Sequence, residues 1–290
     1  MFFALAIGSM LGYTLQSVLL TRAARSIDGL SLAFYRNISF IITLLPLLLG
    51  TDRTGIVATL NHWPLLLASG ISGGVYLALY YTSLRYIPLG IAAAYNKAIG
   101  NGVITLAAFV ILDERLNAIG ILSLVAIVAG TVALATGRTH LYAHLQNHRL
   151  RGFLLIAGGS AFVSFTVFSL GIISRMGNPL AAAYFWEVFI GIGCVPLLIG
   201  RRLTTGHAIQ RITLKQFLII ALCASPTLIG TGLISLATSM GSIAVANIIG
   251  TVSLALTAVI AWLFHEEPLK RRQWLSIILI VCGAMGLKLV

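Results

Sequence analysis

Three ionisable side chains lie inside long apolar stretches of this sequence: Arg36, Lys97 and Glu187. A charged side chain deep in a membrane-spanning helix costs at least about 2.5–3.5 kcal/mol, so such residues usually face a partner or a polar cavity. With a rise of about 1.5 Å per residue, each of the three would lie roughly 9–12 Å below a membrane surface. We therefore expect all three to approach the middle of the membrane and to face a shared cavity.

The residues around Glu187 favour a cation or a proton as its partner. Tyr184, Phe185 and Trp186 precede it directly, and Tyr184 shares a helical face with Glu187 because the two are three residues apart. A carboxylate beside aromatic rings suits an ammonium group, and burial favours the neutral form of a carboxyl group, which would suit a proton carrier. Alternatively, the aromatic residues belong to the membrane interface and Glu187 reaches lipid headgroups.

Lys97 shares a helical face with Asn96 and Asn101. A lysine in such a cavity can bind a carboxylate or phosphate of a solute, or take part in ion coupling; the alternative is a structural pair with Glu187. Arg36 either joins the site or extends its guanidinium toward the membrane surface.

Tyr76 and Tyr80, four residues apart, present a shared aromatic surface that either lines the site or serves packing. We predict a solute-binding site formed by the polar and aromatic residues Arg36, Asn37, Tyr80, Asn96, Lys97, Asn101, Tyr184, Trp186 and Glu187. Within it, Glu187 and Lys97 are the candidates for coupling.

Other kinds of chemistry find little support. The histidines lie in or beside expected loops, and Cys194, Cys223 and Cys282 lie inside apolar stretches without metal-ligand spacing, so we predict no metal site and no cofactor. The sequence has no nucleophile–base pair, metalloprotease motif or nucleotide-binding loop. We therefore expect neither an enzyme nor a nucleotide-driven pump.

The composition is that of an integral membrane protein. The chain has 290 residues, of which 59% are hydrophobic and 9% charged, whereas a soluble domain carries about 25% charged residues. Its net charge of +12 comes mostly from short loops between apolar stretches, which indicates membrane topology and lipid headgroups rather than nucleic acid.

The apolar stretches have the length of membrane-spanning helices, about 17–25 residues each. We expect ten spans, at about 2–21, 30–50, 64–84, 89–112, 118–137, 152–174, 180–200, 217–236, 242–264 and 274–289, with a kink at Pro226. Five spans precede a polar loop at 138–151 and five follow it. The predicted fold is an all-α membrane protein with a first repeat at 1–137 and a second at 152–290.

An internal repeat supports this division. The segment Leu30–Gly50 returns at Leu180–Gly200 with a constant offset of 150 residues, so that Pro46 matches Pro196. A second correspondence, at an offset of 153, relates the turns at 114–116 and 267–269. Because each repeat has an odd number of spans, the second must be inverted relative to the first, an arrangement typical of secondary transporters.

These features resemble the drug/metabolite transporter superfamily, in its EamA-like branch. The resemblance rests on the five-plus-five layout, on the element Phe34-Tyr35-Arg36, and on the turns Asp-Glu-Arg-Leu and Glu-Glu-Pro-Leu at 113–116 and 266–269. Family members often carry a proline upstream of each turn, where this chain has Asn101 and Ser253 or Leu254. The resemblance implies a transporter fold, and it also allows amines, drugs and nucleoside-like solutes.

The sequence therefore predicts a secondary active transporter of a small metabolite that works by alternating access. One carboxylate with two cations fits an amino-acid-like zwitterion; the alternatives are a passive channel or facilitator and an exporter of cationic drugs or nucleoside-like metabolites. We expect the bacterial inner (plasma) membrane, with a small-molecule substrate, lipids and a proton as partners. Loop charges place both termini outside, whereas similar transporters are often drawn with both inside.

Overall fold

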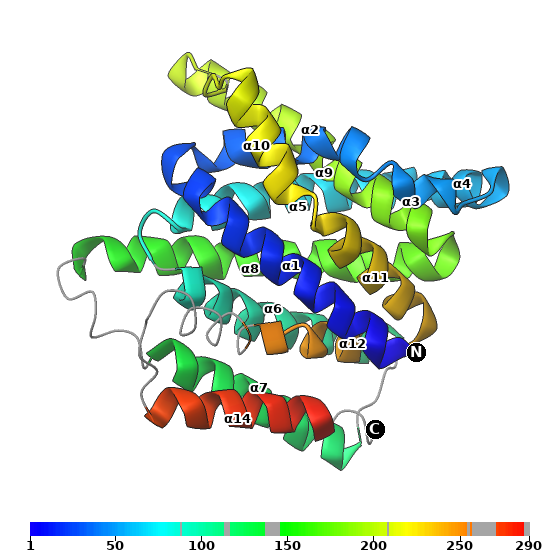
Figure 1. Cartoon of the computed structure of the whole chain (residues 1–290), viewed down its shortest axis with the longest axis vertical. Helices are drawn as coiled ribbons and strands as arrows, with labels where there is room; N and C mark the ends of the chain where they lie inside the picture. Colours follow the sequence, from blue (N-terminus) through cyan, green and yellow to red (C-terminus); the bar gives the residue numbers. More distant parts are fainter. Residues whose placement is uncertain are drawn as a thin grey trace.

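The computed structural model describes residues 1–87, 89–112, 117–136, 146–207, 209–253, 256 and 271–286. Throughout these ranges the regular structure is helical (Figure 1). In chain order the helices are α1 (Phe2–Ser26), α2 (Gly29–Thr43), α3 (Pro46–Leu49), α4 (Arg53–Leu60), α5 (Trp63–Ser83), α6 (Leu89–Leu112), α7 (Ala118–Thr136), α8 (Gln146–Met176), α9 (Pro179–Thr205), α10 (Leu214–Ala224), α11 (Thr227–Met240), α12 (Ile243–Ile249) and α14 (Arg271–Gly286).

The prediction of an all-α integral membrane protein is confirmed. Seven helical segments of the described chain are long and apolar enough to cross a membrane, at Phe2–Ser26, Gly29–Leu49, Trp63–Ser83, Tyr95–Leu112, Leu150–Met176, Pro179–Thr205 and Leu214–Met240. Two shorter apolar helices follow at Ala118–Ala133 and Trp274–Gly283. The count of ten spans stays a prediction, because residues 254, 255 and 257–264 of the expected ninth span, the two glutamate turns and loop residues 138–145 lie outside the described residues.

Two breaks interrupt the helices of the second half. α10 ends at Ala224 and α11 begins at Thr227, which confirms the kink expected at Pro226, since proline lacks the N–H that a continuous helix needs. α12 ends at Ile249, and the amide of Thr251 then donates to the carbonyl of Ile248 at 2.9 Å instead of to that of Asn247.

The helices form three layers along the long axis of the molecule. Figure 1 shows α2 and α9 toward one end, α7 and α14 at the other, and α1, α5, α6, α8, α11 and α12 between them. The middle layer joins the two halves of the chain, because α1 packs against α11 and α12 while α8 packs against α5 and α6. The middle layer is therefore one of the places where the two halves of the chain meet.

The helices α2 and α9 run antiparallel and are joined at both ends by corresponding contacts. At one end Arg201 Nη1 donates to Asp28 Oδ1 at 2.5 Å, and at the other Thr51 Oγ1 donates to Asn178 Oδ1 at 3.4 Å. The offset of 150 residues converts one pair into the other. Asp28 and Asn178 are also the N-caps of α2 and α9, and a side-chain oxygen at this position satisfies free amides of the first helical turn.

The ion pair between Asp28 and Arg201 lies outside the apolar part of α2. Burial alone would raise the pKa of the Asp28 carboxyl, but hydrogen bonds from Ser31 and the charge of Arg201 hold this pKa below its ordinary value. The corresponding pair at the other end is uncharged. The two ends of the α2–α9 pair are therefore alike in position and different in charge.

Glycines allow α7 and α14 to pack closely. A Cβ atom at Gly130 would lie 2.9 Å from the carbonyl oxygen of Ser276, and one at Gly283 would lie 2.8 Å from that of Ser123. The two contacts are related by the 153-residue offset found in the sequence. Small residues permit this approach in membranes, so the matching glycines have a packing function at this end of the molecule.

Candidate functional site

A cavity of about 190 Å³ lies in the middle layer, and both halves of the chain line it. Leu20, Leu84 and Leu89 are among the lining residues, so the cavity extends toward the end of the molecule at which α1 and α5 finish and α6 begins. Of the predicted site residues, the cavity is lined by Arg36, Tyr80, Asn96, Lys97, Trp186 and Glu187. Asn37, Asn101 and Tyr184 are not among the lining residues. They contact α9, the turn after α12, and α2, respectively.

Arg36 and Glu187 form a buried ion pair between α2 and α9. Arg36 Nη1 lies 3.1 Å from Glu187 Oε2, and the two side chains are 5% and 1% exposed. Arg36 also lies over the ring of Phe40, with Cζ 4.6 Å from the ring centre. Once the amide of Gln16 is oriented to suit its neighbours, its oxygen accepts from Arg36 Nε at 2.8 Å. The guanidinium is therefore fixed from several directions.

The carboxylate of Glu187 has a full set of hydrogen-bond donors. Oε2 accepts from Arg36 Nη1 and from Asn37 Nδ2, both at 3.1 Å. Oε1 accepts from Thr231 Oγ1 at 3.0 Å and from Arg36 Nη2 at 3.4 Å. An ionised carboxylate offers about four acceptor positions, so these donors occupy all of them.

These contacts correct two expectations about the surroundings of Glu187. Its ionic partner is Arg36 rather than Lys97, and its oxygens meet polar groups rather than aromatic rings. Tyr184 instead donates to the carbonyl of Ile41 at 3.1 Å, and the indole N–H of Trp186 donates to Thr166 O at 3.0 Å. Trp186 points away from Glu187 because adjacent residues of a helix point in different directions, whereas the hydroxyl of Tyr184 is held by the backbone of α2.

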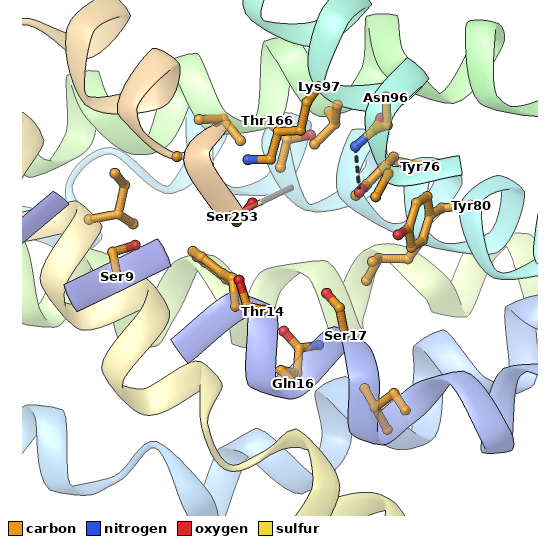
Figure 2. Close-up of a pocket in the computed structure, with 18 of the residues that line it drawn as sticks. Ser9, Thr14, Gln16, Ser17, Tyr76, Tyr80, Asn96, Lys97, Thr166 and Ser253 are labelled. Atoms are coloured by element: carbon orange, nitrogen blue, oxygen red, sulfur yellow. Dashed lines mark hydrogen bonds between the residues drawn. The ribbon is translucent and has the colours of Figure 1, made fainter. Parts of the chain in front are cut away.

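Lys97 extends into the cavity from α6. Figure 2 shows its nitrogen directed into the space between α6, α1 and the segment that carries Ser253. Its Nζ lies 3.5 Å from the position that a Cβ atom on Gly250 would take, beside the end of α12. In the part of the chain that the structure describes, no acidic side chain pairs with Lys97, because Glu187 is held by Arg36. Lys97 therefore supplies the net charge of the cavity.

A second group of polar residues lies next to Lys97. Asn96 Nδ2 donates to the hydroxyl oxygen of Tyr76 at 3.1 Å (Figure 2), and Ser160 Oγ donates to Asn96 Oδ1 at 3.2 Å. Tyr76 is followed one turn later by Tyr80, and their ring centres are 5.6 Å apart. This part of the wall therefore combines aromatic surface with hydroxyl and amide groups, which suits an organic solute with both apolar and polar parts.

Sequence reasoning missed the contribution of α1 and of α12. Tyr13 hydrogen-bonds Thr231 at 2.8 Å, and Gln16 contacts Arg36; both line the cavity together with Asn247. The signal for the first two was present, because Tyr13 and Gln16 are polar side chains within one turn of an apolar span. For Asn247, the signal was its position 150 residues after Lys97.

In the described ranges no three His, Cys, Asp or Glu side chains come together, so these residues offer no candidate metal site. Among the described residues, the arrangement provides a largely apolar cavity between two helical halves, lined by the ion pair of Arg36 with Glu187, the ammonium of Lys97 and an aromatic wall. Two internal repeats with a cavity between them are typical of membrane transporters.

Comparison with known proteins identifies the family. The model of the EamA-like transporter family matches residues 2–136 and 150–289. The chain belongs to this family, and is therefore an integral membrane protein and a small-molecule transporter of the drug/metabolite type. Among curated proteins, none matches the chain.

The fold also occurs in a solved structure titled "Crystal structure of protein". That chain is 15% identical, and the match covers 99% of this chain and 96% of the other with a TM-score of 0.73. At this identity the similarity concerns the fold alone.

Proposed function

We propose that this protein is a secondary active transporter that moves a small amino-acid-like metabolite through the central cavity by alternating access. The observation that carries the proposal is the cavity itself, which both halves line. The ammonium of Lys97 faces this cavity, and no acidic side chain of the described residues pairs with it. The halves at 1–137 and 152–290 would act as inverted repeats. The antiparallel packing of α2 with α9 and the matching contacts at both ends of this pair support that assignment.

The carboxylate of the solute would bind Lys97. A charge-assisted hydrogen bond is stronger than a neutral one, and the dry surroundings of a membrane protein strengthen it further. An ammonium group on the same solute would not bind Glu187, whose oxygens are already occupied. It would instead meet the rings and hydroxyl groups of Tyr76 and Tyr80, since aromatic faces attract cations.

Coupling to a proton would use Lys97 in preference to Glu187. Protonation of Glu187 would have to displace Arg36 and rearrange the contact between α2 and α9, whereas the ammonium of Lys97 already faces the cavity. A bound carboxylate favours the charged form of a neighbouring lysine. Binding of the anion and binding of the proton would therefore assist one another, as symport requires. The site of action would be the bacterial inner membrane.

The test is a thermal-shift screen of the purified protein against amino acids, carboxylates and amines at neutral pH. A ligand that binds only the folded protein at 100 times its Kd stabilises it by about 2.7 kcal/mol. We expect amino acids or carboxylates to stabilise the wild type but not Lys97→Met. Lys215→Met is the matched control, because Lys215 is exposed at the start of α10. Stabilisation by amines that survives in Lys97→Met would contradict the proposed substrate class.

A further inference from the structure

The two halves meet each other at positions that correspond in the repeat. Asn37 Nδ2 donates to the backbone carbonyl of Glu187 at 2.8 Å, and Asn101 Nδ2 donates to Thr251 Oγ1. In both pairs the residues are 150 positions apart. When two units are related by a two-fold axis, a residue touches its own counterpart only close to that axis. The axis that relates the halves therefore passes through both contacts.

Lys97 and Asn247 are also counterparts, and each is one turn away from the second of these contacts. Lys97 precedes Asn101 by four residues on α6, and Asn247 precedes Thr251 by four residues on α12 and the turn that follows it. Lys97 and Asn101 therefore lie on one side of α6, whereas Asn247 and Thr251 lie on either side of the end of α12. Lys97 and Asn247 thus lie on the two sides of the axis, and both line the cavity.

The end of α12 brings the two residues into one local site. The helix breaks after Ile249, so the carbonyl group of Asn247 loses the amide of Thr251 as its partner. The ammonium of Lys97 lies next to Gly250, which is part of this break. The carbonyl end of a helix attracts cations, which helps to keep Lys97 charged here. The Asn247 side chain is 7% exposed and uses Nδ2 to donate to Ile243 O at 2.9 Å.

We propose that Asn247 is a specificity-determining residue that, as the neutral counterpart of Lys97, limits the cavity to solutes with a single negative charge at this point. Because both residues line the cavity close to the axis, a solute group on the axis would lie beside both positions. One of them supplies a full charge and the other supplies only amide hydrogen bonds, so a second negative charge on the solute remains without a partner. An unpaired charge is costly in a buried site. The inference rests on the proposed function, because it assumes that Lys97 binds the solute.

A swap of the two side chains tests the proposal. The double variant Lys97→Asn with Asn247→Lys moves the cation across the axis and keeps the composition of the cavity. As probes we choose benzoate, a monoanion, and isophthalate, a dianion of the same ring, and we measure Kd by calorimetry on purified protein at neutral pH. A matched control combines Lys97→Asn with Ser17→Lys, which places a lysine on α1 at the opposite side of the cavity (Figure 2).

The expected pattern is specific. Lys97→Asn alone weakens benzoate binding at least about tenfold, the worth of a charge-assisted hydrogen bond, and the swap restores it while the Ser17→Lys control does not. Asn247→Lys alone changes the preference from benzoate to isophthalate. If the wild type binds benzoate and the double variant does not regain this binding, the role proposed for Asn247 is wrong, while the anion site at Lys97 stands. A wild type that binds neither probe would overturn the anion site of the proposed function, and the inference with it.

Discussion

Replacement of Glu187 by glutamine would disrupt the ion pair at the contact between α2 and α9. A glutamine oxygen can keep two of the four hydrogen bonds that Glu187 accepts, and the amide nitrogen in place of the second oxygen would face two donors. Two lost hydrogen bonds to a charged group amount to about 3–6 kcal/mol. Removal of one partner of a buried ion pair costs a similar amount, about 3–5 kcal/mol. We therefore expect Glu187→Gln to destabilise the protein by about 3–5 kcal/mol.

The assay is reversible unfolding in mixed micelles, arranged as a double-mutant cycle. The variants are Glu187→Gln, and for the cycle Arg36→Met, Glu187→Met and the two methionine changes combined. Each single change leaves a buried charge without a partner, whereas the double change leaves none, so the double variant should be more stable than either single one. Single variants within about 1 kcal/mol of the wild type, or a double variant with the summed loss, would show that the pair does not stabilise the contact.

Two further predictions concern the ends and the packing of the helices. The pKa of Asp28 is lowered in the folded protein, so its contribution to stability is complete above about pH 3.9 and is lost as the pH falls through the folded pKa. The difference in unfolding free energy between wild type and Asp28→Asn should therefore be constant near neutral pH and shrink below about pH 4. A difference that grows on acidification would contradict this. A Cβ atom at Gly193 would lie 2.2 Å from the carbonyl oxygen of Gly70, whereas one at Gly158 meets no atom within 4 Å. Gly193→Ala should therefore lower the free energy of unfolding by about 1–3 kcal/mol or more, while Gly158→Ala should not. Equal stability of the two variants would argue against close packing of α5 on α9.

The sequence predicted the class of fold because hydropathy and the repeat are encoded directly. Apolar stretches of membrane-spanning length and a constant offset of 150 residues do not depend on contacts between distant residues. The break at Pro226 was also predictable, because proline acts locally. The break after Ile249 was not, because no proline marks it and the segment resembles a continuous apolar helix.

The partners of the buried charges were harder to predict. Burial of Arg36, Lys97 and Glu187 follows from their positions in apolar stretches, but their pairing depends on which helices cross. A signal was nevertheless available, since Asn37 and Glu187 are 150 residues apart and so occupy corresponding positions of the repeat, and corresponding positions of an inverted repeat can meet at its axis. The repeat itself therefore contained the information that Glu187 contacts the neighbourhood of Arg36.

The central claim is that the cavity carries a solute across the membrane by alternating access, and counterflow in proteoliposomes tests it most directly. Vesicles that contain the wild type are loaded with an excess of an unlabelled amino acid identified by the thermal-shift screen, and uptake of the labelled form is followed from outside. A carrier exchanges the two forms, so we predict transient accumulation that saturates with concentration and disappears in Lys97→Met. Uptake that rises linearly, is not stimulated by solute inside the vesicles, and is unchanged in Lys97→Met would instead indicate a passive facilitator and contradict the account.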